Sequence, residues 1–430
     1  MDYKETIQYL YDCVPMFQNV GAQGYKEGLA NTLALDLHLG HPHRSYKTIH
    51  VAGTNGKGSC SHTIAALLQC AGYKVGLYTS PHLVDFRERI RVNGEMVSED
   101  YVVRFVEEQR PFFEPLQPSF FEVTTALAFK YFQDMQVDVA VVEVGLGGRL
   151  DCTNIISPEL CVITNISFDH TQFLGNTLAQ IATEKAGIIK KGIPVVVGET
   201  TEETRPVFAA KASEVGAEIV FAEDEPEVLS YKSSIASGMV YQTKSLGRLK
   251  GELSGYCQQK NTNTVLTALP LLRKAGFEFD DKDVRKAFAH VCRLTGLMGR
   301  WQVLQTSPTV VCDTGHNVGG FQYIVEQLRK QAAKSERLRI VFGMVNDKDI
   351  STVLSMLPKE AEYYFTQASV KRALDAHDLR SKAAGYGLEG QPYPTVSEAY
   401  QAALRDSSPK DFVYVGGSSY VVADLMAAEH

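Results

Sequence analysis

The sequence lacks long apolar runs and clustered cysteines. No stretch of its 430 residues approaches the roughly 20 consecutive apolar positions that span a bilayer. The polar start, Met1–Glu5, is not followed by the apolar core of a signal peptide. Its 8 cysteines are scattered, without the spacing of a zinc site or a disulfide framework. We therefore expect a cytoplasmic protein with reduced cysteines and no membrane span.

The sequence also lacks an excess of basic residues. Its 43 Lys and Arg against 50 Asp and Glu give a formal net charge of -7, whereas a general nucleic-acid binder is usually basic. A local cluster of cations can still bind a small anion in such a protein. Hydrophobic residues make up 44% of the chain and charged residues 22%, as in folded proteins with ordinary cores.

Short β-branched runs alternate with longer helical stretches, which predicts an α/β fold with a mostly parallel sheet. A first series of strands is predicted over residues 48–52, 74–78, 137–143, 160–164 and 193–197. A second series is predicted over residues 309–313, 338–343 and 411–416. The interruption at Thr295–Gly299 is the expected hinge. We therefore predict a larger N-terminal domain over residues 1–295 and a smaller Rossmann-like α/β domain over residues 296–430.

A glycine-rich turn follows the first predicted strand and precedes a helix predicted over residues 61–70; it reads Gly53-Thr54-Asn55-Gly56-Lys57-Gly58-Ser59. Glycines allow backbone N–H groups to converge on an anion, and the helix N-terminus adds positive potential. Lys57 is expected to reach the β- and γ-phosphates of ATP, and the Ser59 hydroxyl to ligate Mg²⁺. The alternative is an ordinary tight turn, in which Lys57 has no purpose. Gly58, between Lys57 and Ser59, departs from the usual P-loop spacing.

Two polar residues follow other predicted strands. Glu143 ends the most apolar strand of the chain, where an unpaired carboxylate would be costly. In P-loop enzymes this position faces magnesium, and the alternative is a carboxylate that caps the next turn. His170 follows the predicted strand 160–164, and ligands gather at the carboxyl ends of parallel strands. We expect both side chains near the metal, although a histidine after a strand is often structural.

These segments together resemble the folylpolyglutamate synthase and dihydrofolate synthase family, within the wider Mur-type amide ligases. The similarity covers nearly the whole chain, and its motifs occur in the family's order: Val51–Ser59 with the extra glycine, Thr79–Leu83, Glu88–Ile90, Glu143–Asn154, Asp169–His170, Glu184–Ile188, Gly255–Asn261, Gly299–Arg300 and Asp313–Asn317. Cys152 replaces an expected alanine. Thr314 and Gly315 stand where the family commonly has glycine and alanine.

The resemblance implies roles for the matched residues. Two magnesium sites are expected, with Ser59, Ser80, Glu143 and His170 as ligands and a carbamylated Lys185 near the second ion. Without the resemblance, Lys185 is simply a helix lysine. Further contacts to ATP are expected from Asn261, Arg300 and Asp313. A pterin-binding segment is expected near the N-terminus, and the implied substrate contacts are Gly28, Leu29, Ser80, Pro81, His82, Ser119, Phe120, Phe121, Asp151 and Cys152. Aromatic rings suit a flat heterocycle, but the two phenylalanines can equally be core.

The implied reaction is activation of a carboxylate by ATP. The substrate carboxylate attacks the γ-phosphorus and forms an acyl phosphate and ADP; the amine of L-glutamate then displaces phosphate. Lys57, Lys185 and His316 are the expected catalytic residues, and His316 would assist deprotonation of the amine. Lys57, Arg300 and magnesium would neutralise charge as it moves. The carboxylate belongs to dihydropteroate, to the terminal glutamate of a reduced folate, or to both, and our hypothesis is both.

Three alternatives remain at this point. The enzyme could be a folylpolyglutamate synthase alone. A peptidoglycan-type Mur ligase typically carries a nucleotide-sugar domain before the loop, and only 52 residues precede Gly53. A nucleotide switch of the GTPase type needs an Asn-Lys-x-Asp motif, and no asparagine is followed by lysine. We expect a monomer that binds only small molecules.

Overall fold

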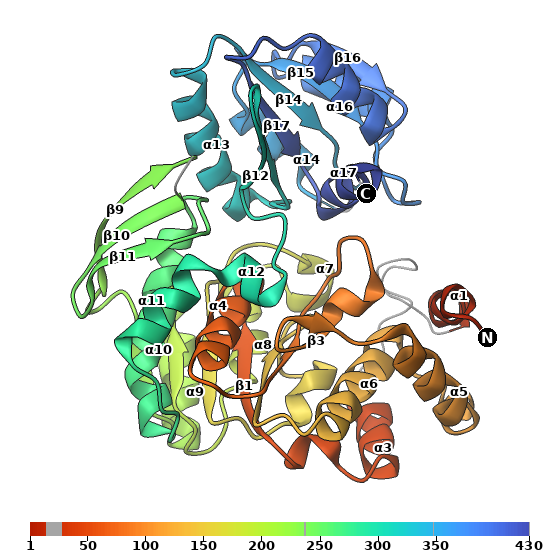
Figure 1. Cartoon of the computed structure of the whole chain (residues 1–430), viewed down its shortest axis with the longest axis vertical. Helices are drawn as coiled ribbons and strands as arrows, with labels where there is room; N and C mark the ends of the chain where they lie inside the picture. The colour runs from red at the N-terminus through yellow and green to blue at the C-terminus, as the bar shows by residue number, and fades with distance from the viewer. Residues whose placement is uncertain (14–27, 236–237, 347, 430) are drawn as a thin grey trace. The chain divides into compact units, whose positions relative to one another are not determined.

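A computed structural model describes residues 1–13, 28–235, 238–346 and 348–429 (Figure 1). The chain forms two compact units. Unit 1 contains residues 1–231, 240–251 and 259–297, and unit 2 contains residues 232–239, 252–258 and 298–430. The pterin-binding segment expected near the N-terminus includes residues 14–27, which lie outside the described residues.

Unit 1 is built on an eight-stranded sheet with the order β4-β3-β2-β5-β1-β6-β7-β8. The six strands β2, β5, β1, β6, β7 and β8, named in their order across the sheet, run parallel. Strands β3 and β4 pair in antiparallel fashion at the edge beside β2. Every residue of β5 is buried, as expected for a parallel strand covered on both faces. The strands are β1 Lys47–Ala52, β2 Val75–Tyr78, β3 Ile90–Val92, β4 Glu95–Met96, β5 Val139–Glu143, β6 Leu160–Ile163, β7 Val195–Val197 and β8 Ile219–Phe221.

Helices surround this sheet, and α4 packs against β1, β2 and β5. Helix α4 begins at Lys57, earlier than the predicted Ser61, because Gly56 adopts a left-handed conformation with φ 85° and caps the first turn. No helix within the described ranges is both long and apolar enough to cross a membrane. The helices are α1 Tyr3–Cys13, α3 Ala30–His38, η2 Pro42–Arg44, α4 Lys57–Cys70, η3 Phe86–Arg89, α5 Glu99–Leu116, α6 Phe120–Asp134, η4 Cys152–Ile155, α7 Thr171–Leu174, α8 Leu178–Ala186, α9 Arg205–Val215, α10 Gln258–Lys274, α11 Asp281–Ala289 and α12 Val291–Thr295.

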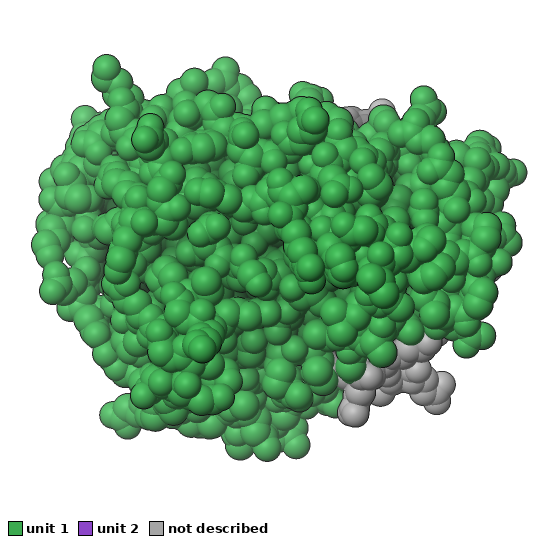
Figure 2. All heavy atoms as spheres, turned by 90° about the horizontal axis from the view of Figure 1, so that it is seen from below, with its two compact units in different colours: residues 1–231, 240–251, 259–297 green, residues 232–239, 252–258, 298–430 purple. Residues whose placement is uncertain are grey.

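The core of unit 1 lies on the two faces of the sheet. One apolar cluster joins α6 to β5 and includes Phe120, Leu127 and Val142. A second cluster packs α8 and α9 on β6 and β7. The outer surface of this unit is seen as spheres in Figure 2. Because apolar side chains cover both faces of the sheet, the carboxyl ends of the strands are where polar groups gather.

A three-stranded sheet, with the order β11-β10-β9, was not predicted from the sequence. Its strands are β9 Val228–Ser234, β10 Gly238–Thr243 and β11 Gly247–Gly251. Strand β9 has one buried residue, Val228, and most of its other side chains are exposed. A strand with so little apolar pattern gives only a weak sequence signal.

Unit 2 is built on a six-stranded sheet with the order β12-β13-β17-β14-β15-β16, in which only the pair of β12 and β13 is antiparallel. Every residue of the central strands β14 and β17 is buried. The predicted α/β fold, with a mostly parallel sheet followed by a smaller α/β unit, is confirmed. The elements are β12 Gln302–Thr306, β13 Thr309–Asp313, α13 Val318–Ala332, β14 Leu338–Phe342, α14 Ile350–Met356, β15 Glu362–Thr366, α15 Ala376–Ala384, β16 Gly390–Tyr393, α16 Val396–Arg405, β17 Phe412–Gly416 and α17 Ser419–Glu429.

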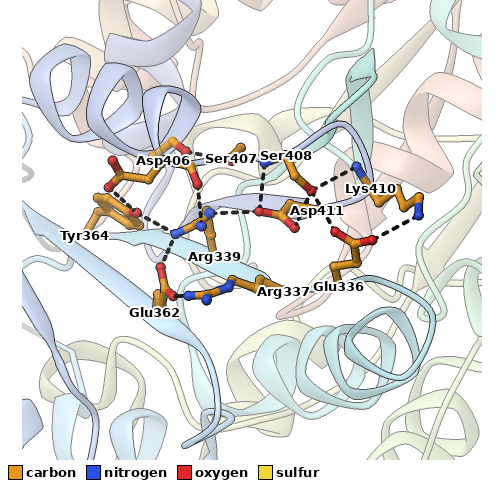
Figure 3. A network of polar contacts seen from close by, with 11 residues as sticks. Glu336, Arg337, Arg339, Glu362, Tyr364, Asp406, Ser407, Ser408, Lys410 and Asp411 are labelled. Atoms are coloured by element: carbon orange, nitrogen blue, oxygen red, sulfur yellow. Dashed lines mark hydrogen bonds and ion pairs between the residues drawn. The ribbon is translucent and has the colours of Figure 1, made fainter.

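A buried arginine joins three of these strands at their amino ends (Figure 3). Arg339 of β14 forms ion pairs with Glu362 of β15 and with Asp411, which precedes β17. Its guanidinium also donates to the Tyr364 hydroxyl over 2.9 Å and to the carbonyl oxygen of Asp406. We refer to these five residues as the Arg339 network.

Candidate active site

The loop from Gly53 to Gly56 joins β1 to α4 and requires glycine at both ends. Gly53 has φ 142° and Gly56 has φ 85°, both in the left-handed region. A Cβ atom on Gly53 would lie 1.9 Å from Thr164 Oγ1, and one on Gly56 would lie 2.2 Å from Asn261 Oδ1. Lys57 and Ser59 then occupy the first turn of α4, where N–H groups and the helix dipole favour an anion.

The segment that follows β6 supports this loop, a role that the sequence analysis missed. The N–H groups of Thr54 and Asn55 donate to the carbonyl and side-chain oxygens of Asn165 over 2.9 and 3.0 Å. Asn55 Nδ2 donates to Ser167 Oγ over 3.2 Å. Polar residues directly after a strand that neighbours β1 were the available signal. These hydrogen bonds fix the backbone of the loop from Gly53 to Gly56.

Two lysines converge on the loop backbone. Lys57 Nζ donates to the Thr54 carbonyl over 3.2 Å, and Lys185 Nζ of α8 donates to the Gly53 carbonyl over 3.0 Å. Lys185 is only 4% exposed. Burial, and then the charge of Lys57, lower the pKa of Lys185 to about 7. Burial and Lys57 therefore favour the neutral amine of Lys185 over its charged form.

Two of the expected metal ligands, Ser80 and Glu143, lie at the carboxyl ends of the adjacent strands β2 and β5, and Ser59 lies in the first turn of α4. Ser59 and Glu143 are buried, and the backbone N–H of Ser80 approaches Glu143 Oε2 at 3.4 Å. His170 follows β6, adopts φ 49° and begins α7. Within the described residues, no group of three or more His, Cys, Asp or Glu side chains could hold a metal ion by itself. Hydroxyl and carboxylate oxygens nonetheless suit Mg²⁺, which is usually completed by water and phosphate oxygens.

Asp151 and Phe121 flank Gly145, which lies just beyond the end of β5. A Cβ atom on Gly145 would lie 3.3 Å from Asp151 Oδ2 and 3.5 Å from the Phe121 ring. The Asp151 carboxylate accepts from the N–H groups of Leu146 and Thr153 over 2.8 and 2.9 Å. Burial raises the pKa of Asp151, and these hydrogen bonds act in the opposite direction. Phe121 is half-buried and is the ring that remains partly accessible.

Other expected substrate contacts have structural partners. Phe120 is fully buried in the core cluster, the alternative considered from its sequence. Ser119 caps α6 in a reciprocal arrangement with Glu122. Cys152 is buried with its Sγ 3.1 Å from Thr125 Oγ1. The remaining expected contacts stand at chain turns: Gly28 with φ 102° and Leu29 precede α3, and Ser80 and Pro81 share a cis peptide bond.

His82 connects α1 to a buried arginine that the sequence analysis quoted without a role. Arg89 Nε donates to His82 Nδ1 over 2.7 Å, and the Tyr11 hydroxyl lies 3.1 Å from His82 Nε2. The Arg89 guanidinium lies over the rings of Phe120 and Phe121, 5.2 and 5.6 Å from their centres. Burial lowers the pKa of His82 to about 3, and the positive charge of Arg89 is the second cause of this shift, so the ring is neutral.

Unit 2 brings together three of the expected residues at the carboxyl end of β13. Asp313 accepts from the N–H groups of Trp301 and Gly315, each over 2.7 Å. Burial raises the pKa of Asp313, while the neighbouring Arg300 acts to lower it. His316 Nδ1 lies 3.1 Å from the Thr314 carbonyl. Lys57 and Asn261 belong to unit 1, so each unit carries its own part of the expected nucleotide contacts.

Comparisons with known proteins show the family to which the chain belongs. Residues 51–268 match the Mur ligase middle domain, and residues 299–419 match the Mur ligase glutamate ligase domain. The chain is 33% identical to the dihydrofolate synthase/folylpolyglutamate synthase of Bacillus subtilis, over 94% of this chain and 95% of that protein.

Solved structures are similar over the whole chain. Escherichia coli FolC in complex with DHPP and ADP matches with a TM-score of 0.84 and 31% identity, covering 100% of this chain and 98% of that one. The bifunctional Yersinia pestis enzyme complexed with AMPPNP and a Mn ion matches with a TM-score of 0.81 and 30% identity, at 100% and 98% coverage. The chain belongs to the dihydrofolate synthase/folylpolyglutamate synthase family of Mur-type, ADP-forming ligases, as its motifs predicted.

Proposed function

We propose that this ligase adds L-glutamate to both dihydropteroate and the terminal glutamate of a reduced folate. The observation that carries the proposal is the joint position of Asp151 and Phe121 against Gly145, on the sheet that also bears the phosphate loop. The near full-length similarity to a relative named for both activities supports the same choice.

The chemistry of the two side chains suits a pterin. Its pyrimidine ring presents neighbouring N–H donors, and a buried carboxylate such as Asp151 accepts such donors. The ring is flat, so the half-buried face of Phe121 can stack on it. Of the other expected contacts, Gly28, Leu29, Ser80, Pro81 and His82 remain proposed members of this pocket, whereas Ser119, Phe120 and Cys152 have the structural partners described above.

The proposed nucleotide contacts begin with the glycine loop and Lys57. The relatives solved with ADP, or with AMPPNP and manganese, support ATP and a divalent cation for this chain as well. Ser59, Ser80, Glu143 and His170 would hold magnesium, which would offset negative charge on the phosphates. Asn261, Arg300 and Asp313 are the further proposed contacts to ATP, the last two in a C-terminal domain over residues 296–430.

The reaction itself needs charge control by the protein. Lys57 donates to the γ-phosphate as the substrate carboxylate attacks it, and Arg300 stabilises the acyl phosphate and the ADP leaving group. The carbon–nitrogen bond forms when the glutamate amine attacks the acyl carbon, and phosphate leaves. His316 accepts the proton that the amine loses.

We also propose that Lys185 is carbamylated. Its buried, largely neutral amine next to the Gly53 carbonyl is suited to attack CO₂, which forms an N–C bond and releases one proton. The product would be an anion that could supply an oxygen ligand to a second magnesium ion. Lys185→Ala and Lys185→Arg, assayed with and without bicarbonate, test this proposal. We expect both variants to be inactive, and full activity of either one would overturn it.

An assay of the purified protein with ATP and glutamate tests the two activities separately. We expect ADP release and a new amide product with dihydropteroate and also with tetrahydrofolate. Product from tetrahydrofolate alone would leave a folylpolyglutamate synthase. No product from either acceptor would refute the proposed function. We further propose that the protein is cytoplasmic and monomeric, and light scattering tests whether it is a monomer. The seven cysteines from Cys60 to Cys312 are free thiols.

A further inference from the structure

A buried histidine on β1 is linked to Asp151 through one threonine. His50 is 0% exposed, and its Nε2 lies 2.8 Å from the Thr153 hydroxyl. That hydroxyl donates in turn to Asp151 Oδ1, which also accepts from the Thr153 N–H. Three residues from two segments of the chain therefore form one continuous path: His50, Thr153 and Asp151.

The direction of this path follows from the number of protons available. The Thr153 hydroxyl has one proton and gives it to the carboxylate, so it must accept from His50. His50 Nε2 is therefore the protonated nitrogen. Burial, and then the charge of Lys190, lower the pKa of His50 to about 3, so the ring stays neutral with a single N–H.

The other nitrogen of the ring makes this arrangement costly. His50 Nδ1 is buried and has no hydrogen-bond partner among the described residues. A buried polar atom without a partner destabilises a fold, and an aliphatic side chain at this position of β1 would avoid the cost. An aliphatic residue at this position could not donate the hydrogen bond that His50 gives to the Thr153 hydroxyl.

We infer that His50 and Thr153 are positioning residues that hold the Asp151 carboxylate in the orientation that reads the pterin ring. The Leu146 N–H holds Oδ2 over 2.8 Å, while Thr153 holds Oδ1, so both oxygens are fixed. Their remaining lone pairs then face a defined direction. This inference rests on the proposed role of Asp151 in pterin binding.

The test compares Thr153→Val with Thr153→Ser by calorimetric titration of dihydropteroate onto the protein with ADP and magnesium. Valine keeps the shape and removes the hydroxyl; serine keeps the hydroxyl. We expect Thr153→Val to weaken binding about tenfold, because a hydrogen bond to a charged group is lost, and Thr153→Ser to stay within about twofold. His50→Leu should weaken binding about threefold. The KM for ATP should not change in any of them.

Thr264→Val is the matched control, because Thr264 is equally buried and donates to the Lys260 carbonyl on α10. It should bind dihydropteroate like the wild type. The inference is overturned if Thr153→Val binds dihydropteroate as tightly as the wild type, or if Thr153→Ser binds it as weakly as Thr153→Val. It is also overturned if Thr153→Val raises the KM for ATP by the same factor as it weakens dihydropteroate binding. Binding is measured without turnover, so a wild type that binds but forms no amide refutes only the proposed function. A wild type that does not bind dihydropteroate overturns both.

Discussion

Lys185 in unit 1 and Arg339 in unit 2 are both buried cations, yet their surroundings differ. The Arg339 network surrounds its guanidinium with two carboxylates, a hydroxyl and a carbonyl (Figure 3). Among the described residues, the hydrogen-bond partner of Lys185 is one carbonyl, and Lys57 is the cation beside it. Burial lowers the pKa of both groups, but Tyr364, Glu362 and Asp411 reverse that effect for Arg339 and raise its pKa.

This difference indicates that Arg339 has a structural role, whereas Lys185 is available for chemistry. The Arg339 network lies at the amino ends of its strands, whereas Lys185 contacts the loop at the carboxyl end of β1. Ligands bind at carboxyl ends in open α/β sheets. A cation whose partners are complete stabilises the fold, while one whose partners are incomplete is available for a ligand or a modification.

The largest effect is expected from Lys57→Ala. Removal of the cation that we propose to face the phosphates should lower kcat/KM for ATP by about 100- to 1,000-fold, as loss of one transition-state donor does. Stability should change little, because the hydrogen-bond partner of Lys57 among the described residues is a single carbonyl, that of Thr54. Measurement of ADP release, with the exposed Lys191→Ala as control, checks this. An unchanged rate of ADP release would show that Lys57 has no role in the reaction.

Arg339→Met is expected to show the opposite behaviour. Removal of one partner from a buried ionic network commonly costs about 3–5 kcal/mol, and the partly exposed Glu362 places this case near the lower value. Urea unfolding should report the loss, while the KM for ATP of the folded fraction stays constant. Arg337→Met removes an exposed ion pair with the same Glu362 and serves as control. A large change in KM without loss of stability would contradict the structural role.

Lys185→Met should lose activity but gain stability. In the unmodified protein, Lys185 has a pKa near 7, against 10.5 ordinarily. Between these pH values the unfolded chain binds the proton and the folded protein does not, so the contribution of Lys185 to stability improves as pH rises. Below pH 7 both states are protonated and the full cost remains.

The expected gain of Lys185→Met is therefore a few kcal/mol at pH 6, with about 5 kcal/mol as the upper bound, and shrinks toward pH 10. Urea unfolding in bicarbonate-free buffer with a chelator measures it, with Lys191→Met as the surface control. A gain that does not depend on pH would show that Lys185 is not the titrating group.

The smallest effect is expected from Arg205→Ala. Arg205 forms two hydrogen bonds with Asp224, over 2.8 and 2.6 Å, but both side chains are exposed to solvent. Exposed ion pairs contribute little, since water screens them. Thermal unfolding should shift by no more than the error of the measurement. A shift as large as that of Arg339→Met would mean that burial is not what distinguishes these networks.

Much of the fold was predictable because its signals are local. The apolar runs of β1, β5 and β6 and the central strands of unit 2 lie within or close to their predicted ranges. The glycines of the phosphate loop were recognisable because their positive φ angles leave few other residues possible. The weakly apolar strands β9 to β11 were missed for the opposite reason, since their residues alternate little between polar and apolar.

The site was less predictable than the fold. Ser119 and Phe120 matched the family by position, yet the structure uses one as a helix cap and the other as core. Arg89 had no role from sequence, although its guanidinium covers the two phenylalanine rings. Contacts of this kind depend on which strands become neighbours, and a single sequence does not state that.

The sequence by itself determined the buried parallel strands, the glycine loop and the family, because these depend on residues close together in the chain. Tertiary structure alone decided that Lys185 meets the carbonyl of Gly53, 132 residues away, and that His50 meets Thr153, 103 residues away. Burial produced by those meetings changes the pKa values of Lys185 and His50. The physical reason is that desolvation depends on everything that packs around a group, which only the folded chain defines.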